Sequence, residues 1–203
     1  MRSSYGFYRF GYMLTRVLIG LPFRFSVSGR ENIPGGAAIV SINHSSYIDP
    51  FFIAFAFGIR QQVHFVAKAE LFRKPVISAA VIMLGAISVD RDISDITTIK
   101  NMLHYLKNNK KVAIFPEGTR ARVDGAIEAK IGAVKIAEHS GVPILPIYVP
   151  RRKRLFRKTH IVIGKPYIIE KQKKKRTADE YQQLTDEMMA GIASLNQKAA
   201  ANL

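Results

Sequence analysis

The segment NHSSYID at 43–49 holds a histidine and an aspartate separated by four residues, a combination that could carry out proton transfer. A loop of this length can fold back so that Asp49 accepts the proton on one ring nitrogen of His44, which leaves the other nitrogen free as a base. The carboxylate would then fix the tautomer and stabilise the imidazolium that forms when His44 takes a proton from a hydroxyl. Because such pairs also arise by chance, the simpler alternative is an ordinary loop in which Asp49 caps a helix with Pro50 in its first turn.

The segment FPEGTR at 115–120 predicts an anion-binding turn. Gly118 allows the backbone to approach a ligand closely, and the exposed amide groups of a turn favour negative charge. Arg120 or Arg122 could hold a phosphate through two hydrogen bonds, while Glu117 could bind a hydroxyl or orient an arginine. Taken alone, the segment is equally compatible with a polar surface turn.

A third segment, GAISVDR at 85–91, ends a predicted strand with an aspartate next to an arginine. This placement would bring Arg91 to the sheet edge where the other two segments lie. Without those segments, a surface ion pair is the expected role of such residues.

These segments have to be positioned by regular elements, and short apolar runs do alternate with helical patterns along the chain. The predicted strands are 37–42, 63–67, 86–89, 112–115, 144–149 and 161–163, and the predicted helices are 50–57, 75–83, 96–108, 128–139 and 177–195. Gly141 is expected to end the fourth of these helices, and Thr177 with Glu180 forms a capping-box pattern for the last. The alternation predicts an α/β fold, a layered and mostly parallel sheet flanked by helices. Reactive side chains of such sheets gather at the carboxyl ends of the strands, which is where all three segments fall.

The chain of 203 residues is expected to form one domain behind an N-terminal helix. We divide it into an interfacial membrane-anchoring helix at 1–25 and a single α/β domain at 26–203, with a motif core at 30–150 and a basic part at 151–203. The N-terminal segment mixes arginines with aromatic and aliphatic residues, which predicts an amphipathic helix at a membrane interface; the alternative is a helix packed on the core. The apolar run 51–59 is too short to span a bilayer and is either buried in the protein or embedded in one leaflet.

Charge is the outlying property of the composition, with 31 basic and 15 acidic residues. Twelve of the basic residues lie at 151–176, where only one acidic residue occurs, and we place the runs 151–158 and 171–176 on the surface. The partners compatible with this block are nucleic acid, an anionic membrane surface and an acidic carrier protein, beside an ordinary solvated face. A nucleic-acid-binding module finds no support in a matching aromatic, zinc-ligand or helix-turn-helix pattern. The absence of cysteine excludes disulfides, thiolate nucleophiles and cysteine-ligated metals.

Together the segments resemble the glycerolipid acyltransferase family, in particular the bacterial lysophosphatidate acyltransferases. NHSSYID matches the family's N-H-x-x-x-x-D block, GAISVDR its phosphate-side block, FPEGTR its central signature and VPILP at 142–146 its fourth block, in the family's order. The stretch AKAELFRKP at 67–75 also resembles the family. The one departure is Ser88, where the family often has an aromatic residue, and it bears on the acceptor.

The resemblance implies direct acyl transfer, with His44 as general base on an acceptor hydroxyl that attacks an acyl thioester, and with Asp49 orienting His44. No covalent enzyme intermediate is implied, and the lack of a G-x-S-x-G elbow agrees with this. The phosphate of the acceptor would be held by residues of the second and third segments and by a lysine of 67–75: Lys68, Arg91, Glu117, Gly118, Thr119 and Arg120.

The function expected from this resemblance is conversion of lysophosphatidate into phosphatidate in phospholipid biosynthesis, at the cytoplasmic face of the cell membrane. Neither a metal nor a bound redox cofactor is expected, and acyl-CoA or acyl carrier protein would supply the thioester. The alternatives keep the chemistry and change the acceptor to glycerol-3-phosphate, another lysophospholipid or an amino-acid lipid.

Overall fold

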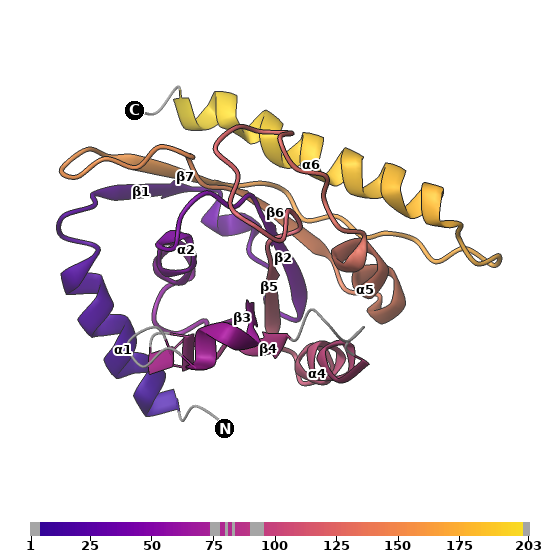
Figure 1. Ribbon diagram of the computed structural model, residues 1–203, viewed down its shortest axis with the longest axis horizontal. Helices are drawn as coiled ribbons and strands as arrows, with labels where there is room; N and C mark the ends of the chain where they lie inside the picture. The colour runs from indigo at the N-terminus through magenta and orange to yellow at the C-terminus, as the bar shows by residue number, and fades with distance from the viewer. Residues whose placement is uncertain (1–4, 74–77, 80, 83, 90–95, 201–203) are drawn as a thin grey trace.

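The computed structural model describes residues 5–73, 78–79, 81–82, 84–89 and 96–200. They form a seven-stranded sheet in the order β1-β7-β6-β2-β5-β3-β4 (Figure 1). The strands are β1 (Phe25–Ser28), β2 (Ala38–Ile42), β3 (Val63–Lys68), β4 (Ile87–Val89), β5 (Lys111–Ile114), β6 (Ile144–Tyr148) and β7 (Thr159–Ile163). The α-helices are α1 (Tyr5–Leu18), α2 (Asp49–Phe57), α4 (Ile96–Lys107), α5 (Gly132–Ser140) and α6 (Ala178–Ala200), with short 3-10 turns at Arg30–Asn32 and Ala69–Arg73.

The predicted α/β fold is confirmed, and every pair of neighbouring strands is parallel except β6 with β7. The strands β2 and β6 are buried along their whole length, because helices cover both faces of the sheet. The helices α4, α5 and α6 pack on one face, while α2 and, outside it, α1 pack on the other (Figure 1).

Several element boundaries differ from the prediction: α6 runs to Ala200 instead of 195, and β7 begins at Thr159 instead of 161. Two further differences involve α1 and α5. The helix α1 ends at Leu18 and the chain enters β1 at Phe25, a strand that the sequence pattern did not indicate. The helix α5 begins at Gly132 instead of 128, because the amide of Lys130 donates to the carbonyl oxygen of Pro116 at 2.9 Å and keeps the preceding residues in a loop. The predicted helix at 75–83 lies largely outside the described residues.

The apolar run 51–59 forms most of α2, and the structure places it inside the protein. Residues 52–57 are buried, and the helix has apolar side chains around its whole circumference, as a core helix requires. The ring of Phe55 contacts Tyr12 of α1 edge-on at 5.5 Å and stacks on Phe25 at 5.6 Å between ring centroids. Of the two alternatives for this run, burial in the protein is therefore the one observed.

The helix ends follow the sequence pattern. Gly141 ends α5 with a φ of 68°, a left-handed conformation that glycine adopts without strain. At the start of α6, the amide of Thr177 donates to Glu180 at 2.7 Å and the amide of Glu180 donates to the Thr177 hydroxyl at 3.2 Å. The predicted capping box is thus confirmed.

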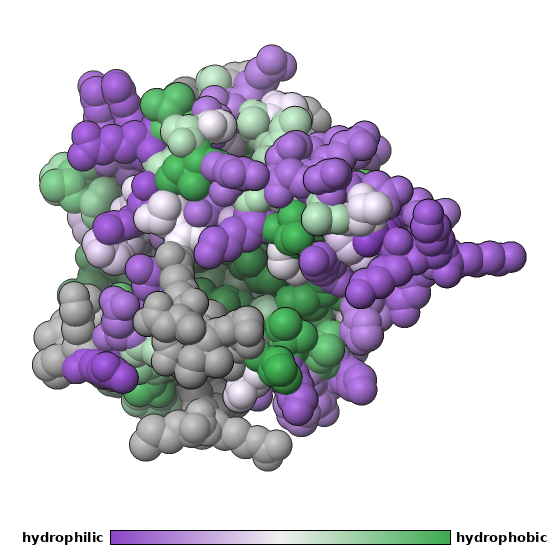
Figure 2. Space-filling view, turned by 45° about the vertical axis from the view of Figure 1, so that its right-hand side comes forward, coloured by the Kyte–Doolittle hydropathy of each residue, from purple (hydrophilic) through white to green (hydrophobic). Residues whose placement is uncertain are grey.

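The molecular surface reflects the excess of basic residues. Figure 2 shows hydrophilic side chains projecting over much of one face, with smaller hydrophobic areas between them. In the described ranges, none of the helices has the combination of length and hydropathy that crossing a bilayer needs.

Candidate active site

His44, in the loop between β2 and α2, faces Asp49, the first residue of α2. The Nδ1 atom of His44 lies 3.0 Å from Oδ2 of Asp49, which is fully buried. The same Oδ2 accepts hydrogen bonds from the amides of Ser45 at 2.7 Å and Ser46 at 2.8 Å. These donors precede Asp49, and Ile48 caps α2 without a side-chain bond, so the expectation that Asp49 caps the helix is wrong. Its carboxylate instead closes the loop that presents His44.

A buried lysine holds the other oxygen of Asp49. The Nζ atom of Lys153 lies 2.6 Å from Oδ1 of Asp49 and 2.8 Å from the hydroxyl of Ser45, and its side chain is only 3% exposed. Burial raises the pKa of Asp49, but the hydrogen bond from His44 and the charge of Lys153 outweigh burial and hold that pKa below its ordinary range. Burial lowers the pKa of Lys153, and Asp49 partly offsets this. The carboxylate beside His44 therefore stays ionised.

Glu117 and Arg151 hold the backbone of His44 from both sides. The amide of His44 donates to Oε2 of Glu117 at 2.6 Å, and Oε1 of Glu117 accepts a hydrogen bond from Arg151 at 2.6 Å. The carbonyl oxygen of His44 accepts from Arg151 at 3.1 Å and from the amide of Ala121 at 2.8 Å. Arg151 also donates to Asp124 at 2.6 Å. This network joins the loop after β2 to the loop after β5.

Arg151 and Lys153 correct the prediction that the run 151–158 lies wholly on the surface. Their side chains are 8% and 3% exposed and point into the site, while Arg152 and Arg154 between and beyond them are exposed. The run follows β6, whose parallel pairing with β2 brings its end to the same sheet edge. That continuation of a central strand, with alternating side-chain directions, is the sequence signal that could have identified the two residues.

The ring of His44 stacks on Phe115 with the centroids 4.1 Å apart and the planes 26° apart. This contact and the bond to Asp49 fix the ring so that Nε2 is the nitrogen left for a substrate. Among the described residues, Nε2 has no hydrogen-bond partner. The arrangement can therefore accept a proton from a hydroxyl placed at Nε2.

The other predicted site residues lie around this centre. Gly118 adopts a φ of 64° in the turn after β5, and the next residue, Thr119, is exposed. The guanidinium of Arg120 lies 3.6 Å from the ring centroid of Tyr47, in the loop that holds His44. Lys68 is exposed at the end of β3, on the same sheet edge but two strands from β2. Arg91 lies outside the described residues.

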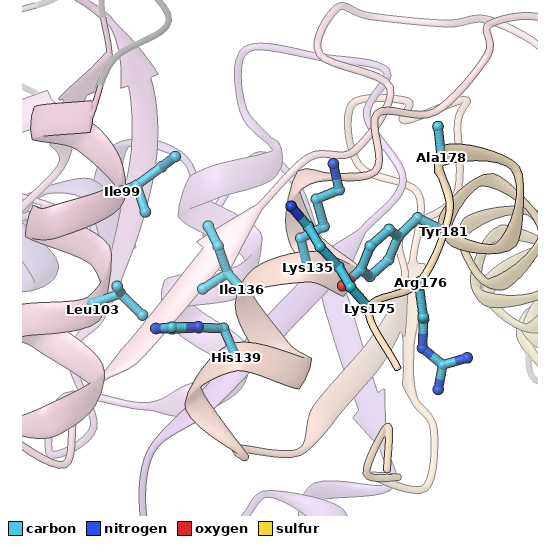
Figure 3. A pocket seen from close by; sticks show the side chains of 9 residues that line it. All are labelled: Ile99, Leu103, Lys135, Ile136, His139, Lys175, Arg176, Ala178 and Tyr181. Carbon is cyan, nitrogen blue, oxygen red and sulfur yellow. The ribbon is translucent and has the colours of Figure 1, made fainter. Parts of the chain in front are cut away.

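A cavity of about 480 Å³ lies elsewhere, between α4, α5 and the start of α6 (Figure 3). None of the predicted site residues lines it; its walls are Ile99, Leu103, Lys135, Ile136, His139, Lys175, Arg176, Ala178 and Tyr181. Beside it, Glu138 accepts hydrogen bonds from Tyr181 and from Arg176, which fastens the segment before α6 to α5. Within the described ranges, no group of three His, Cys, Asp or Glu side chains could hold a metal ion.

Comparison with known proteins places this geometry in a family. The acyltransferase family model matches residues 24–150, which contain β1 to β6 and most of the site. A 1-acyl-sn-glycerol-3-phosphate acyltransferase of Bacillus subtilis is 32% identical over 166 residues, which is 78% of this chain and 81% of the relative. One of Pseudomonas aeruginosa is 34% identical over 142 residues, 68% of this chain and 53% of that protein.

A solved structure agrees with the sequence relatives. The crystal structure of the 1-acyl-sn-glycerophosphate (LPA) acyltransferase PlsC from Thermotoga maritima superposes with a TM-score of 0.66 at 26% identity, covering 94% of this chain and 78% of that one. The resemblance indicated by the four sequence blocks is thereby confirmed. The chain belongs to the acyltransferase family.

Proposed function

We propose that the protein transfers a fatty acyl group from an acyl thioester to the sn-2 hydroxyl of lysophosphatidate, which gives phosphatidate. The observation that carries this proposal is the His44–Asp49 pair, with Nε2 of His44 unbonded among the described residues and the FPEGTR turn beside it. The names of the similar proteins from Bacillus subtilis and Thermotoga maritima support the choice of acceptor.

In this proposal His44 is the general base. Its Nε2 takes the proton of the acceptor hydroxyl as the oxygen attacks the thioester carbonyl carbon, and the ionised Asp49 stabilises the imidazolium that results. The new C–O bond forms, the C–S bond breaks, and the proton passes from His44 to the departing thiolate. The acyl group thus moves directly between substrates, without an enzyme-bound ester.

The acceptor phosphate is placed among the exposed cations near His44. Arg120 is held at the mouth of the site by its contact with Tyr47. The turn at Gly118 brings the exposed Thr119, with its amide and hydroxyl donors, beside it. Lys68 and Arg91 complete the proposed set. Glu117 is not proposed to contact the acceptor, because its two carboxylate oxygens already bind the amide of His44 and the guanidinium of Arg151. Its proposed role is to keep the His44 loop in place.

The enzyme is proposed to work at the cytoplasmic face of the cell membrane, with α1 as an interfacial anchor. The helix buries Tyr8 and Thr15 against the protein and leaves an apolar stripe exposed. That stripe consists of Phe7, Phe10, Met13, Leu14, Val17 and Leu18. An apolar outer face is unfavourable in water and fits the headgroup region of a bilayer, where the acceptor resides. The donor is proposed to be acyl-CoA or acyl carrier protein.

An acceptor panel tests the proposal. Labelled acyl-CoA and acyl carrier protein thioesters are offered with lysophosphatidate, glycerol-3-phosphate or lysophosphatidylcholine in mixed micelles. Labelled phosphatidate from lysophosphatidate alone is the expected result. Transfer only to another acceptor would contradict the proposed substrate, and no transfer from either donor would contradict the proposed reaction.

A further inference from the structure

We propose that the tip of the loop between β6 and β7, Leu155 and Phe156, inserts into the interface of an anionic membrane as a second contact besides α1. This inference rests on the proposed function in placing the enzyme at a membrane. The side chains of Leu155 and Phe156 are 57% and 75% exposed, and Phe156 is the most exposed large hydrophobic residue of the described chain. More than half of each side chain is therefore in contact with solvent instead of with the rest of the protein.

The backbone holds the tip in this outward position. Phe156 has a φ of 61°, a left-handed conformation that is rare and costly for a bulky residue. Its amide donates to the carbonyl oxygen of Pro22 at 2.7 Å, and the amide of Thr159 donates to the carbonyl oxygen of Arg24 at 2.8 Å. The fold therefore maintains an unfavourable conformation that exposes an aromatic ring, which is the pattern of a functional contact.

The charges around the tip select an anionic partner. Arg152, Arg154, Arg157 and Lys158 are all exposed, and no acidic residue occurs between 151 and 169. Each basic residue near an anionic lipid surface contributes a favourable interaction, while Leu155 and Phe156 can enter the apolar boundary below the headgroups. A nucleic acid or an acidic protein would use the charges but gives no reason for the exposed Leu–Phe pair.

The tip continues the apolar face of α1. The bond from Phe156 to Pro22 places the tip next to the segment that follows α1. Leu21 is exposed in this segment, as is Leu18 at the end of α1. In Figure 1 the loop between β6 and β7 and the connection from α1 to β1 lie on the same side of the molecule. A single membrane surface can therefore contact both elements.

The same loop reaches the active site from its other side. Arg151 and Lys153 hold Glu117 and Asp49 through contacts of 2.6 Å, only three to five residues before Phe156. Insertion of the tip would thus fix the distance between His44 and the headgroup layer that contains the acceptor. The loop links membrane contact to alignment of the reacting groups.

A single tryptophan tests the insertion directly, because the natural chain contains none. Phe156→Trp is compared with Ile168→Trp, a matched site that is 61% exposed and lies outside the loop. Both full-length variants are titrated with vesicles of 70% phosphatidylcholine and 30% phosphatidylglycerol, with and without brominated acyl chains. The proposal predicts a blue shift and bromine quenching for the tryptophan at 156 and neither for the one at 168.

Flotation with vesicles measures how much the two side chains of the tip contribute to membrane binding. Leu155→Ser with Phe156→Ser should lower the vesicle partition coefficient about tenfold, the effect of removing the partial burial of two apolar side chains. The control pair Ile96→Ser with Ile168→Ser should leave it unchanged. Circular dichroism confirms that both variants fold.

Three results would overturn the inference: an unquenched tryptophan at 156 on floating protein, no flotation of the natural chain, or binding that the Ser pair leaves intact and salt abolishes. The last would show that the loop contacts the vesicle through charge alone and that Leu155 and Phe156 do not insert. None of these measurements contains substrate, so failure of the proposed acyl transfer is seen separately in the micelle assay.

Discussion

The buried pair of Lys153 and Asp49 gives the sharpest quantitative prediction. At the observed separation of 2.6 Å, two unit charges in an effective dielectric constant of about 20 attract by about 6 kcal/mol. The loss of hydration offsets part of this attraction, and removing one partner from a buried pair costs about 3–5 kcal/mol. We expect Lys153→Met to lower the free energy of unfolding by about 3 kcal/mol, because Asp49 is then left buried with an unpaired oxygen.

A double-mutant cycle separates this pairing from general packing. Lys153→Met, Asp49→Asn and the double variant are unfolded in urea and followed by circular dichroism. Since the double variant contains no unpaired buried charge, it should be destabilised by at least about 2 kcal/mol less than the sum of the single effects. Arg154→Met is the control at an exposed neighbouring cation, and its effect should stay within about 0.5 kcal/mol.

One outcome of the double-mutant cycle would contradict the proposed interaction between Lys153 and Asp49. Single effects that add to within about 0.5 kcal/mol would show that Lys153 and Asp49 do not interact, whatever their distance. The account of how Asp49 is kept ionised beside His44 would then be wrong.

Three further predictions concern other parts of the molecule. Arg120→Ala should raise the KM for lysophosphatidate with little change in kcat, because a phosphate contact is made in both the ground and the transition state. Steady-state assays that show a lower kcat at an unchanged KM would refute this role. Glu138→Gln should destabilise the protein at pH 7, because hydrogen bonds from Tyr181 and Arg176 hold the Glu138 pKa below its ordinary value of 4.5. This stabilisation is fully present above 4.5 and is lost as the pH falls through the lowered pKa, so the difference in thermal midpoint should shrink steadily as the pH is lowered below 4.5; a difference that stays constant over the acid range would contradict it. Leu14→Ser with Val17→Ser in α1 should weaken flotation with vesicles more than turnover in micelles, and unchanged flotation would count against an interfacial α1.

Much of the fold could be predicted from the sequence because its central strands are continuous apolar runs separated by helical patterns. A continuous apolar strand such as β2, alternating with helical patterns, is typical of a parallel sheet covered on both faces, and β2 is indeed buried at every position. The strand β1 could not be predicted, because FSVS is only four residues long and half-buried, and its pairing with β7 is decided by tertiary contact. The same holds for the start of α5, where a bond between Lys130 and Pro116 overrides helical propensity.

Some residues of the candidate site could likewise be predicted from the sequence, and others could not. His44, Asp49 and Glu117 are in short segments whose residue types indicate chemistry, and the structure brings them together. Arg151 and Lys153 belong to a block with twelve basic residues, and composition cannot tell which of these turn inward. That choice depends on the end of β6, where Asn43 binds the amide and the carbonyl of Val149 at 2.8 Å each and sets the direction of the following side chains.

The central claim is that His44 is the base for transfer to lysophosphatidate, and one comparison tests it most directly. The rate of phosphatidate formation is measured for the natural chain and for His44→Ala, with His139→Ala on α5 as a control that lies outside the site. We expect a loss of about 10² to 10⁴ in kcat for His44→Ala, an unchanged rate for His139→Ala and unaltered folding of both. A rate for His44→Ala close to that of the natural chain would show that His44 is not the base.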